Sequence, residues 1–80
     1  MSERARLAWR CRRGMLELDL LLGGFLERGY DGLEEHQQSL FRAMLEWPDQ
    51  ELLAQLLGQQ PPKDGEYAEI IAAIRRAAAP

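Results

Sequence analysis

The chain has 80 residues, of which 46% are hydrophobic and 29% charged, and its formal net charge is −3. A chain of this length supports one modest core and leaves no room for a nucleotide-binding domain beside a substrate domain. The negative charge argues against nonspecific nucleic-acid binding, because that binding requires a basic surface that neutralises phosphates.

The cysteine content and the short apolar runs indicate the cellular compartment of the protein. Cys11 is the only cysteine, so the chain can form neither an internal disulfide nor a cysteine-based metal site. The apolar run at residues 20–22 is far too short to span a membrane, and the first residues show no secretory signal. We therefore expect a cytoplasmic protein that does not insert into membranes.

The helix-capping and helix-breaking residues of the chain predict an all-α fold, a small single-domain bundle of about five short helices over residues 1–80. No segment alternates as strands do, and valine and threonine are absent. Ser2 can cap a first helix that ends near Arg12, where Gly14 separates it from the second helix. Asp31 can cap the third helix, and Pro48 suits the start of the fourth. The expected helices cover residues 3–12, 15–28, 32–47, 48–57 and 66–78.

Apolar residues recur in each expected helix at intervals of three or four, which is typical of helices with one face in a core. Helices this short do not persist alone, so packing of these faces must hold them. The predicted core residues are Leu7, Ala8, Cys11, Met15, Leu18, Leu21, Leu22, Phe25, Leu26, Leu33, Leu40, Met44, Trp47, Leu52, Leu53, Leu56, Leu57, Tyr67, Ile70, Ile71 and Ile74.

Several residues of the second helix fall outside its core stripe. Glu17 lies opposite the stripe with Gly24 and Arg28 near it, and Leu16 and Leu20 also lie off the stripe. One interpretation is a helix buried on two sides, with Glu17 merely solvated. The other is a partner-binding face, on which the glycine lets another group approach closely.

The residues around Gly14 also leave two interpretations open. Trp9 can cover the edge of the core, or it can stack with Arg13 as a cation–π pair and anchor an interface. Because Gly14 is expected to place the end of one helix beside the start of the next, Arg13 and Glu17 can pair with each other or jointly address a partner. The five arginines within the first thirteen residues make this segment basic on an acidic protein.

No pattern of catalytic or metal-binding residues is present. His36 is the only histidine and has no cysteine or second histidine to complete a metal site. Cys11 lies on the predicted core stripe and is expected to pack as a small apolar group. The glycines do not form a phosphate-binding loop. We therefore expect neither catalytic residues nor a metal site.

The segment WRCRRGMLELD, followed by LLL, Phe25 and Tyr30, resembles the bacterial FAD assembly factors of succinate dehydrogenase. That family is related to the mitochondrial succinate dehydrogenase assembly factor 2. Its signature is Arg-Gly-x-x-Glu, usually continued by Leu-Asp, and the likeness extends through LFRAMLEWPDQELLAQLLG and IIAAIRR over nearly the whole chain. The signature stands here as Arg13, Gly14, Met15, Leu16, Glu17, Leu18 and Asp19.

The resemblance implies a five-helix protein that is not an enzyme. Such a protein binds the flavoprotein subunit of succinate dehydrogenase, or in some bacteria that of fumarate reductase. It promotes covalent attachment of FAD to a histidine of that subunit. We expect a monomer that holds no cofactor stably, because FAD is handled in the partner. The partner-binding residues implied by the resemblance are Trp9, Arg12, Arg13, Gly14, Met15, Glu17 and Asp19.

The chain departs from the family pattern at Gln55, where a tryptophan is common, and at Trp47 and Pro48, where more polar residues are usual. The family has also been linked to toxin–antitoxin pairs, so an antitoxin-type or general protein-binding adaptor is the alternative function. A DNA-binding helical domain has only the basic first helix in its favour, and the acidic remainder opposes it.

Overall fold

The computed structural model describes residues 2–62 and 64–78 of the chain. Within these residues all regular structure is helical, which confirms the predicted all-α fold of about five short helices. A single turn of 3-10 helix, η1, is inserted after the second helix. The elements are α1 (Glu3–Arg10), α2 (Leu16–Arg28), η1 (Tyr30–Gly32), α3 (Glu35–Met44), α4 (Asp49–Leu56) and α5 (Gly65–Ala78).

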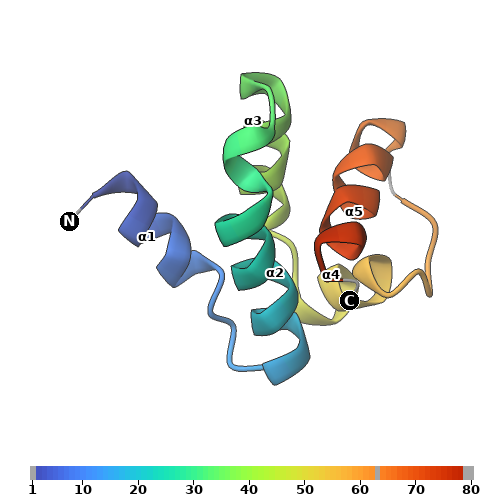
Figure 1. Cartoon of the computed structure of the whole chain (residues 1–80). Helices are drawn as coiled ribbons and strands as arrows, with labels where there is room; N and C mark the ends of the chain where they lie inside the picture. The colour runs from blue at the N-terminus through green and yellow to red at the C-terminus, as the bar shows by residue number, and fades with distance from the viewer. Residues whose placement is uncertain (1, 63, 79–80) are drawn as a thin grey trace.

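The bundle is organised around the packing of α2 against α5. Helix α5 also packs against α3 and α4, so it holds at least three of the other α-helices together. Helix α1 stands to one side of the bundle and is joined to α2 by an extended turn (Figure 1). Its buried side chains are Leu7 and, at its C-terminal cap, Cys11. The first helix therefore contributes the fewest buried side chains of the five α-helices.

One cluster of buried side chains forms the core, and most of its members lie on the predicted stripes. The ring of Phe41, which was not predicted, lies 5.4 Å from the rings of both Phe25 and Tyr30. Ala8, which was predicted to face the core, is exposed. The buried apolar residues are Leu7, Cys11, Leu18, Leu22, Phe25, Leu26, Tyr30, Phe41, Met44, Leu45, Leu52, Leu56, Ile70, Ile71 and Ile74.

The first helix ends earlier than its sequence predicts. Cys11 is the C-terminal cap, and residues 12–15 have no helical structure, so Gly14 does not join two helices within one residue. The backbone N–H groups of Arg13 and Gly14 donate to the carboxylate of Asp19 instead. An aspartate that accepts these bonds competes with helix continuation, and this explains the early end.

The third helix is shorter than predicted at both ends. Asp31 lies in η1, and the N-terminal cap is Glu34, which forms a reciprocal capping box with Gln37. The helix ends at Met44, and Trp47 lies in the turn that leads to α4. The sequence placed the cap three residues early because an aspartate before a glycine suits a turn as well as a cap.

Candidate partner-binding surface

The turn between α1 and α2 is held from one side by Asp19, in the first turn of α2. Its Oδ1 accepts the backbone N–H of Arg13 at 2.6 Å, and its Oδ2 accepts that of Gly14 at 3.3 Å. Asp19, which the family resemblance placed among the partner-binding residues, therefore has a defined role inside the chain. It fixes the backbone that precedes Glu17.

Gly14 is required by the backbone of this turn. Its φ is +85°, in the region that L-residues with a side chain rarely adopt. A Cβ atom at this position would meet no other atom within 4 Å, so the glycine relieves backbone strain and not steric crowding in the free protein.

The side chain of Arg13 reaches across to the turn between α3 and α4. Its Nε donates to Oδ1 of Asp49 at 2.8 Å, and its Nη atoms donate to the carbonyls of Leu45 at 2.6 Å and Trp47 at 2.9 Å. A further bond of 3.2 Å goes to the carbonyl of Arg10. The side chain is only 15% exposed, so the guanidinium is a link between distant turns.

The predicted Arg13–Glu17 pair therefore does not form, and of the two residues only Glu17 is exposed. Arg13 points into the bundle and pairs with Asp49, whereas Glu17 is exposed. In the described part of the chain, Glu17 makes no hydrogen bond or ion pair. The prediction failed because it assumed that the first helix runs up to Gly14 and the second begins directly after it, whereas residues 12–15 are not helical.

Trp9 stacks with a different arginine from the one predicted. The guanidinium carbon of Arg12 lies 5.6 Å from the centre of the indole, within the range of a cation–π contact. The predicted partner, Arg13, is engaged with Asp49 instead. Trp9 is 63% exposed, so it covers little of the core and presents an aromatic face with a cation above it.

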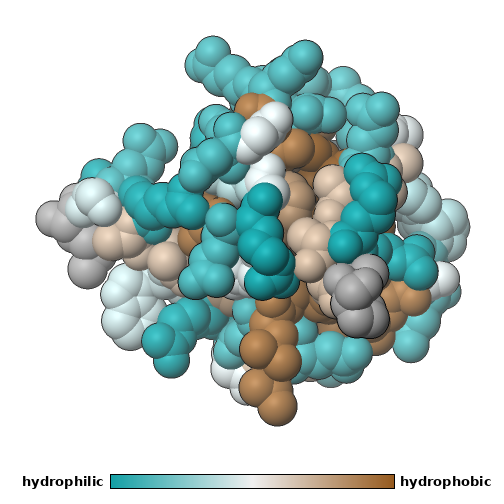
Figure 2. Space-filling view, in the orientation of Figure 1, coloured by the Kyte–Doolittle hydropathy of each residue, from teal (hydrophilic) through white to brown (hydrophobic). Residues whose placement is uncertain are grey.

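The large hydrophobic side chains that are exposed in the described residues flank this one turn. Leu16 is 77% exposed, Leu20 is 65% exposed, and both lie beside Glu17 on the first turns of α2. Figure 2 shows hydrophobic side chains protruding where α2 begins in Figure 1. We call Trp9, Arg12, Leu16, Glu17 and Leu20 the docking surface. The two leucines are absent from the site that the family resemblance implied, although the sequence placed them off the core stripe, on the candidate partner-binding face of the second helix.

Met15 is the remaining residue of the predicted site. It caps the N-terminus of α2, and its half-buried side chain packs against the core. The structure thus separates the signature into two groups. Met15 and the residues that fix the turn (Arg13, Gly14 and Asp19) are engaged within the chain, while Glu17 faces solvent.

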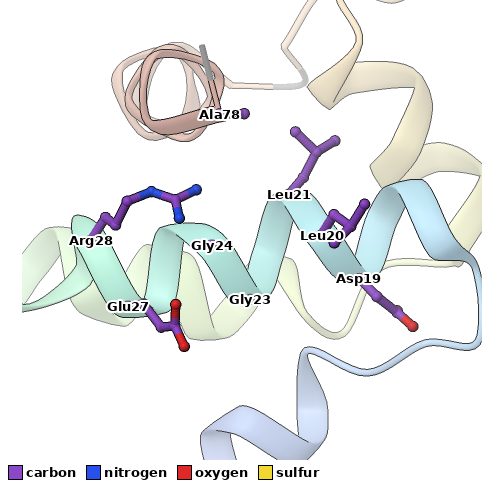
Figure 3. Close-up of a pocket in the computed structure, with 8 residues that line it drawn as sticks. All are labelled: Asp19, Leu20, Leu21, Gly23, Gly24, Glu27, Arg28 and Ala78. Carbon is purple, nitrogen blue, oxygen red and sulfur yellow. The ribbon is translucent and has the colours of Figure 1, made fainter. Parts of the chain in front are cut away.

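A shallow hollow adjoins the docking surface along α2. Figure 3 shows Leu21 and Arg28 reaching toward the end of α5, while Asp19 and Glu27 point the other way. Arg28 lies over Gly24, where a Cβ atom would collide with its Nη2, and its Nε donates to the carbonyl of Ala77 at 3.2 Å. The group that approaches the glycine closely is therefore an arginine of the same helix.

Cys11 and His36 have ordinary structural positions. Burial raises the pKa of the Cys11 thiol to about 11, although Arg13 and Arg10 oppose the shift, so the thiol stays protonated at neutral pH. His36 is exposed, and its Nε2 lies 3.6 Å from Oε1 of Glu66. In the described residues, no three side chains of histidine, cysteine, aspartate or glutamate come together as metal ligands do. None of the described helices is both long and apolar enough to cross a bilayer.

Comparison with known proteins places this fold and turn in one family. The family model described as the flavinator of succinate dehydrogenase matches residues 5–78. A FAD assembly factor of Legionella pneumophila strain Paris is 47% identical over 91% of each chain. Those of Idiomarina loihiensis and Shewanella oneidensis are 44% and 42% identical over 89% and 95% of this chain, and over 79% and 93% of their own lengths. The chain therefore belongs to the family of succinate dehydrogenase FAD assembly factors.

The comparisons confirm the resemblance that the Arg-Gly-x-x-Glu segment indicated. The names of the matched relatives give no support to the antitoxin alternative.

Proposed function

We propose that this chain binds the flavoprotein subunit of succinate dehydrogenase and promotes covalent attachment of FAD to a histidine of that subunit. In this proposal the chain acts by binding alone. It holds no FAD of its own, and the flavin bond is completed by groups of the client subunit. Membership of the assembly-factor family and the open surface at the α1–α2 turn both support this role.

The observation that carries the proposal is the exposed, unpaired Glu17 between two exposed leucines. Its carboxylate has no partner among the described residues. Burial of the exposed side chains of Leu16 and Leu20 against a partner would be favourable, because it removes apolar surface from water. Apolar contacts supply affinity at an interface, while a complementary charge fixes the orientation of the partner. Folding uses none of these three side chains, so a partner is the simplest reason for their arrangement.

Binding alone can accelerate a reaction within a client. A protein that binds one conformation of its client more tightly than the others increases the population of that conformation. If the favoured conformation holds the flavin against its acceptor histidine, attachment becomes faster because the reacting groups are already aligned. The assembly factor then needs complementarity to one client conformation and no catalytic group.

The fumarate reductase flavoprotein is a second client under this proposal, and the chain acts as a monomer with one client molecule. Each client would meet the same docking surface, because Glu17 and its flanking leucines offer one charge in an apolar surround. The two clients would then share a basic group at the point that faces Glu17.

Replacement of Glu17 by alanine tests the proposal. We expect Glu17→Ala to weaken client binding by about tenfold or more, because the client's charge loses its partner at an interface. Covalent flavin in the client, measured as fluorescence of the denatured subunit on a gel, should fall accordingly. The melting temperature should hardly change, since the carboxylate is exposed and unpaired.

Glu35→Ala is the matched control, because Glu35 is also an exposed carboxylate in the first turn of a helix. It should leave client binding and flavin attachment unchanged. Normal flavin attachment with Glu17→Ala would refute the docking role of this residue, and failure of the unaltered chain to bind either client would refute the proposed function.

A further inference from the structure

We infer that Arg13 is a positioning residue, which holds the two halves of the docking surface in a fixed relation without contacting the client. One half is Trp9 with Arg12, at the end of α1, and the other is Glu17 with its leucines, on α2. The inference rests on the proposed function, because it concerns how the docking surface is built. It assigns the arginine of the signature to the support of the interface and not to the interface itself.

The guanidinium of Arg13 has little capacity left for a partner. Its five N–H groups form a fixed fork, and they already serve one carboxylate and three carbonyl oxygens at 2.6–3.2 Å. The side chain is 15% exposed. A client that used this charge would first have to break bonds to Asp49 and to the carbonyls of the α3–α4 turn, which are strong because the donor is ionised.

Few other contacts hold the α1–α2 turn in place. Residues 12–15 form no helix, and Asp19 secures their backbone only to α2. Arg13 adds the connection from this turn to the carbonyls of Leu45 and Trp47 and to α4. The turn is thus held between α2 on one side and the α3–α4 connection on the other.

The two halves of the docking surface depend on this connection to different degrees. The α2 half is anchored by its own helix, since Leu18 and Leu22 are completely buried. The α1 half is attached through Leu7, Cys11 and arginine side chains, and α1 stands at the edge of the bundle (Figure 1). Loss of Arg13 would therefore let Trp9 and Arg12 move relative to Glu17, and a client would have to order them on binding.

Two substitutions test the inference from opposite ends of the connection. Arg13→Gln removes the guanidinium. Asp49→Ala removes the carboxylate that pairs with it, and Asp49 lies on α4, a helix that contributes no residue to the docking surface. Affinity for the purified flavoprotein subunit is measured at 10 °C, where each variant is first shown to be folded by circular dichroism. We expect Arg13→Gln to weaken binding about tenfold and Asp49→Ala about threefold, because the carbonyl bonds survive in the second variant.

Further readouts separate positioning from a general loss of stability. In both variants, amide hydrogen exchange at residues 12–15 should be faster while exchange in α5 stays slow. An excess of either variant should restore full covalent flavin in the client, because only affinity is lost. The double variant should bind like Arg13→Gln alone, since both substitutions break one connection. Glu35→Ala, which removes an exposed carboxylate from another helix start, should bind normally.

Two results would overturn the inference. If Arg13→Gln weakens binding while Asp49→Ala binds normally, the guanidinium contacts the client directly. If both variants bind like the unaltered chain, the turn needs no such support. Either result leaves the proposed function standing, provided that the unaltered chain binds the subunit; failure of the unaltered chain to bind it would refute the proposed function itself.

Discussion

Gln55 is the residue whose side chain suits its environment least. It is 2% exposed, and its Oε1 has no hydrogen-bond partner in the described part of the structure. Leaving a buried acceptor unpaired costs about 1 to 3 kcal/mol, because the group has lost its bonds to water. Gln55 is therefore a weak point of the core.

Gln55→Leu should stabilise the protein, because leucine fills a similar space without a polar atom. We expect the free energy of unfolding to rise by about 1 to 3 kcal/mol, with an increase in melting temperature that calorimetry can measure. Gln50→Leu, at an exposed position of the same helix, should change the stability by less than about 0.5 kcal/mol. A lower melting temperature for Gln55→Leu would mean that the amide is satisfied in solution.

At the scale of the helices, arginine side chains connect the ends of the elements. Arg4 donates to the carbonyl of Leu26 at 2.6 Å, Arg10 to that of Arg42 at 3.2 Å, and Arg28 to that of Ala77 at 3.2 Å. The last carbonyls of a helix have no partner within it and carry partial negative charge, so cations bind them well. Much of the basic N-terminal segment is thus explained by the attachment of α1 to the bundle.

Arg4→Met should loosen α1 while the other helices stay intact. Arg4 bonds both to the carbonyl of Leu26 and to Asp31, at 2.7 Å, and its side chain is partly exposed, so we expect a loss of about 1 kcal/mol. Hydrogen exchange resolved by residue should show faster exchange in α1 and little change in α5. Arg6→Met is the control, because Arg6 is exposed and its side chain makes no hydrogen bond or ion pair within the described residues. Equal exchange in the two variants would contradict this role of Arg4.

For the molecule as a whole, α2 has a buried side and an exposed side. Its inner side packs on α5 through completely buried residues such as Leu22 and Ile74, and its outer side presents Leu16 and Glu17. The stability of the bundle and the proposed docking therefore depend on different residues of one helix. This separation allows a partner-binding surface to change without loss of the fold.

Leu22→Ala and Leu16→Ala form a matched pair that tests this separation. Leu22 is completely buried, so its truncation should cost about 2 to 5 kcal/mol and lower the melting temperature of the whole bundle. Leu16→Ala should change stability by less than about 0.5 kcal/mol but weaken client binding. Thermal denaturation and client affinity measure the two effects. Similar destabilisation by both substitutions would show that the outer side of α2 is also structural.

The sequence by itself determined the helical class, most of the core and the family. Apolar spacing and helix-breaking residues act locally, so they predicted α2, α4 and α5 to within about one residue. The same spacing predicted that Leu16, Glu17 and Leu20 lie off the core. It did not reveal Phe41 or Leu45 as core residues, because burial on a second side of a helix depends on which neighbour covers it.

Only the tertiary structure decided the roles of the charged residues around Gly14. Arg13 and Asp49 are separated by 36 positions, and the carbonyls of Leu45 and Trp47 belong to a turn that no residue pattern connects to Arg13. A long, flexible side chain can reach many partners, and its position along a helix does not select among them. The packing that brings the α1–α2 turn against the α3–α4 turn selected the partners of Arg13, and it left Glu17 exposed.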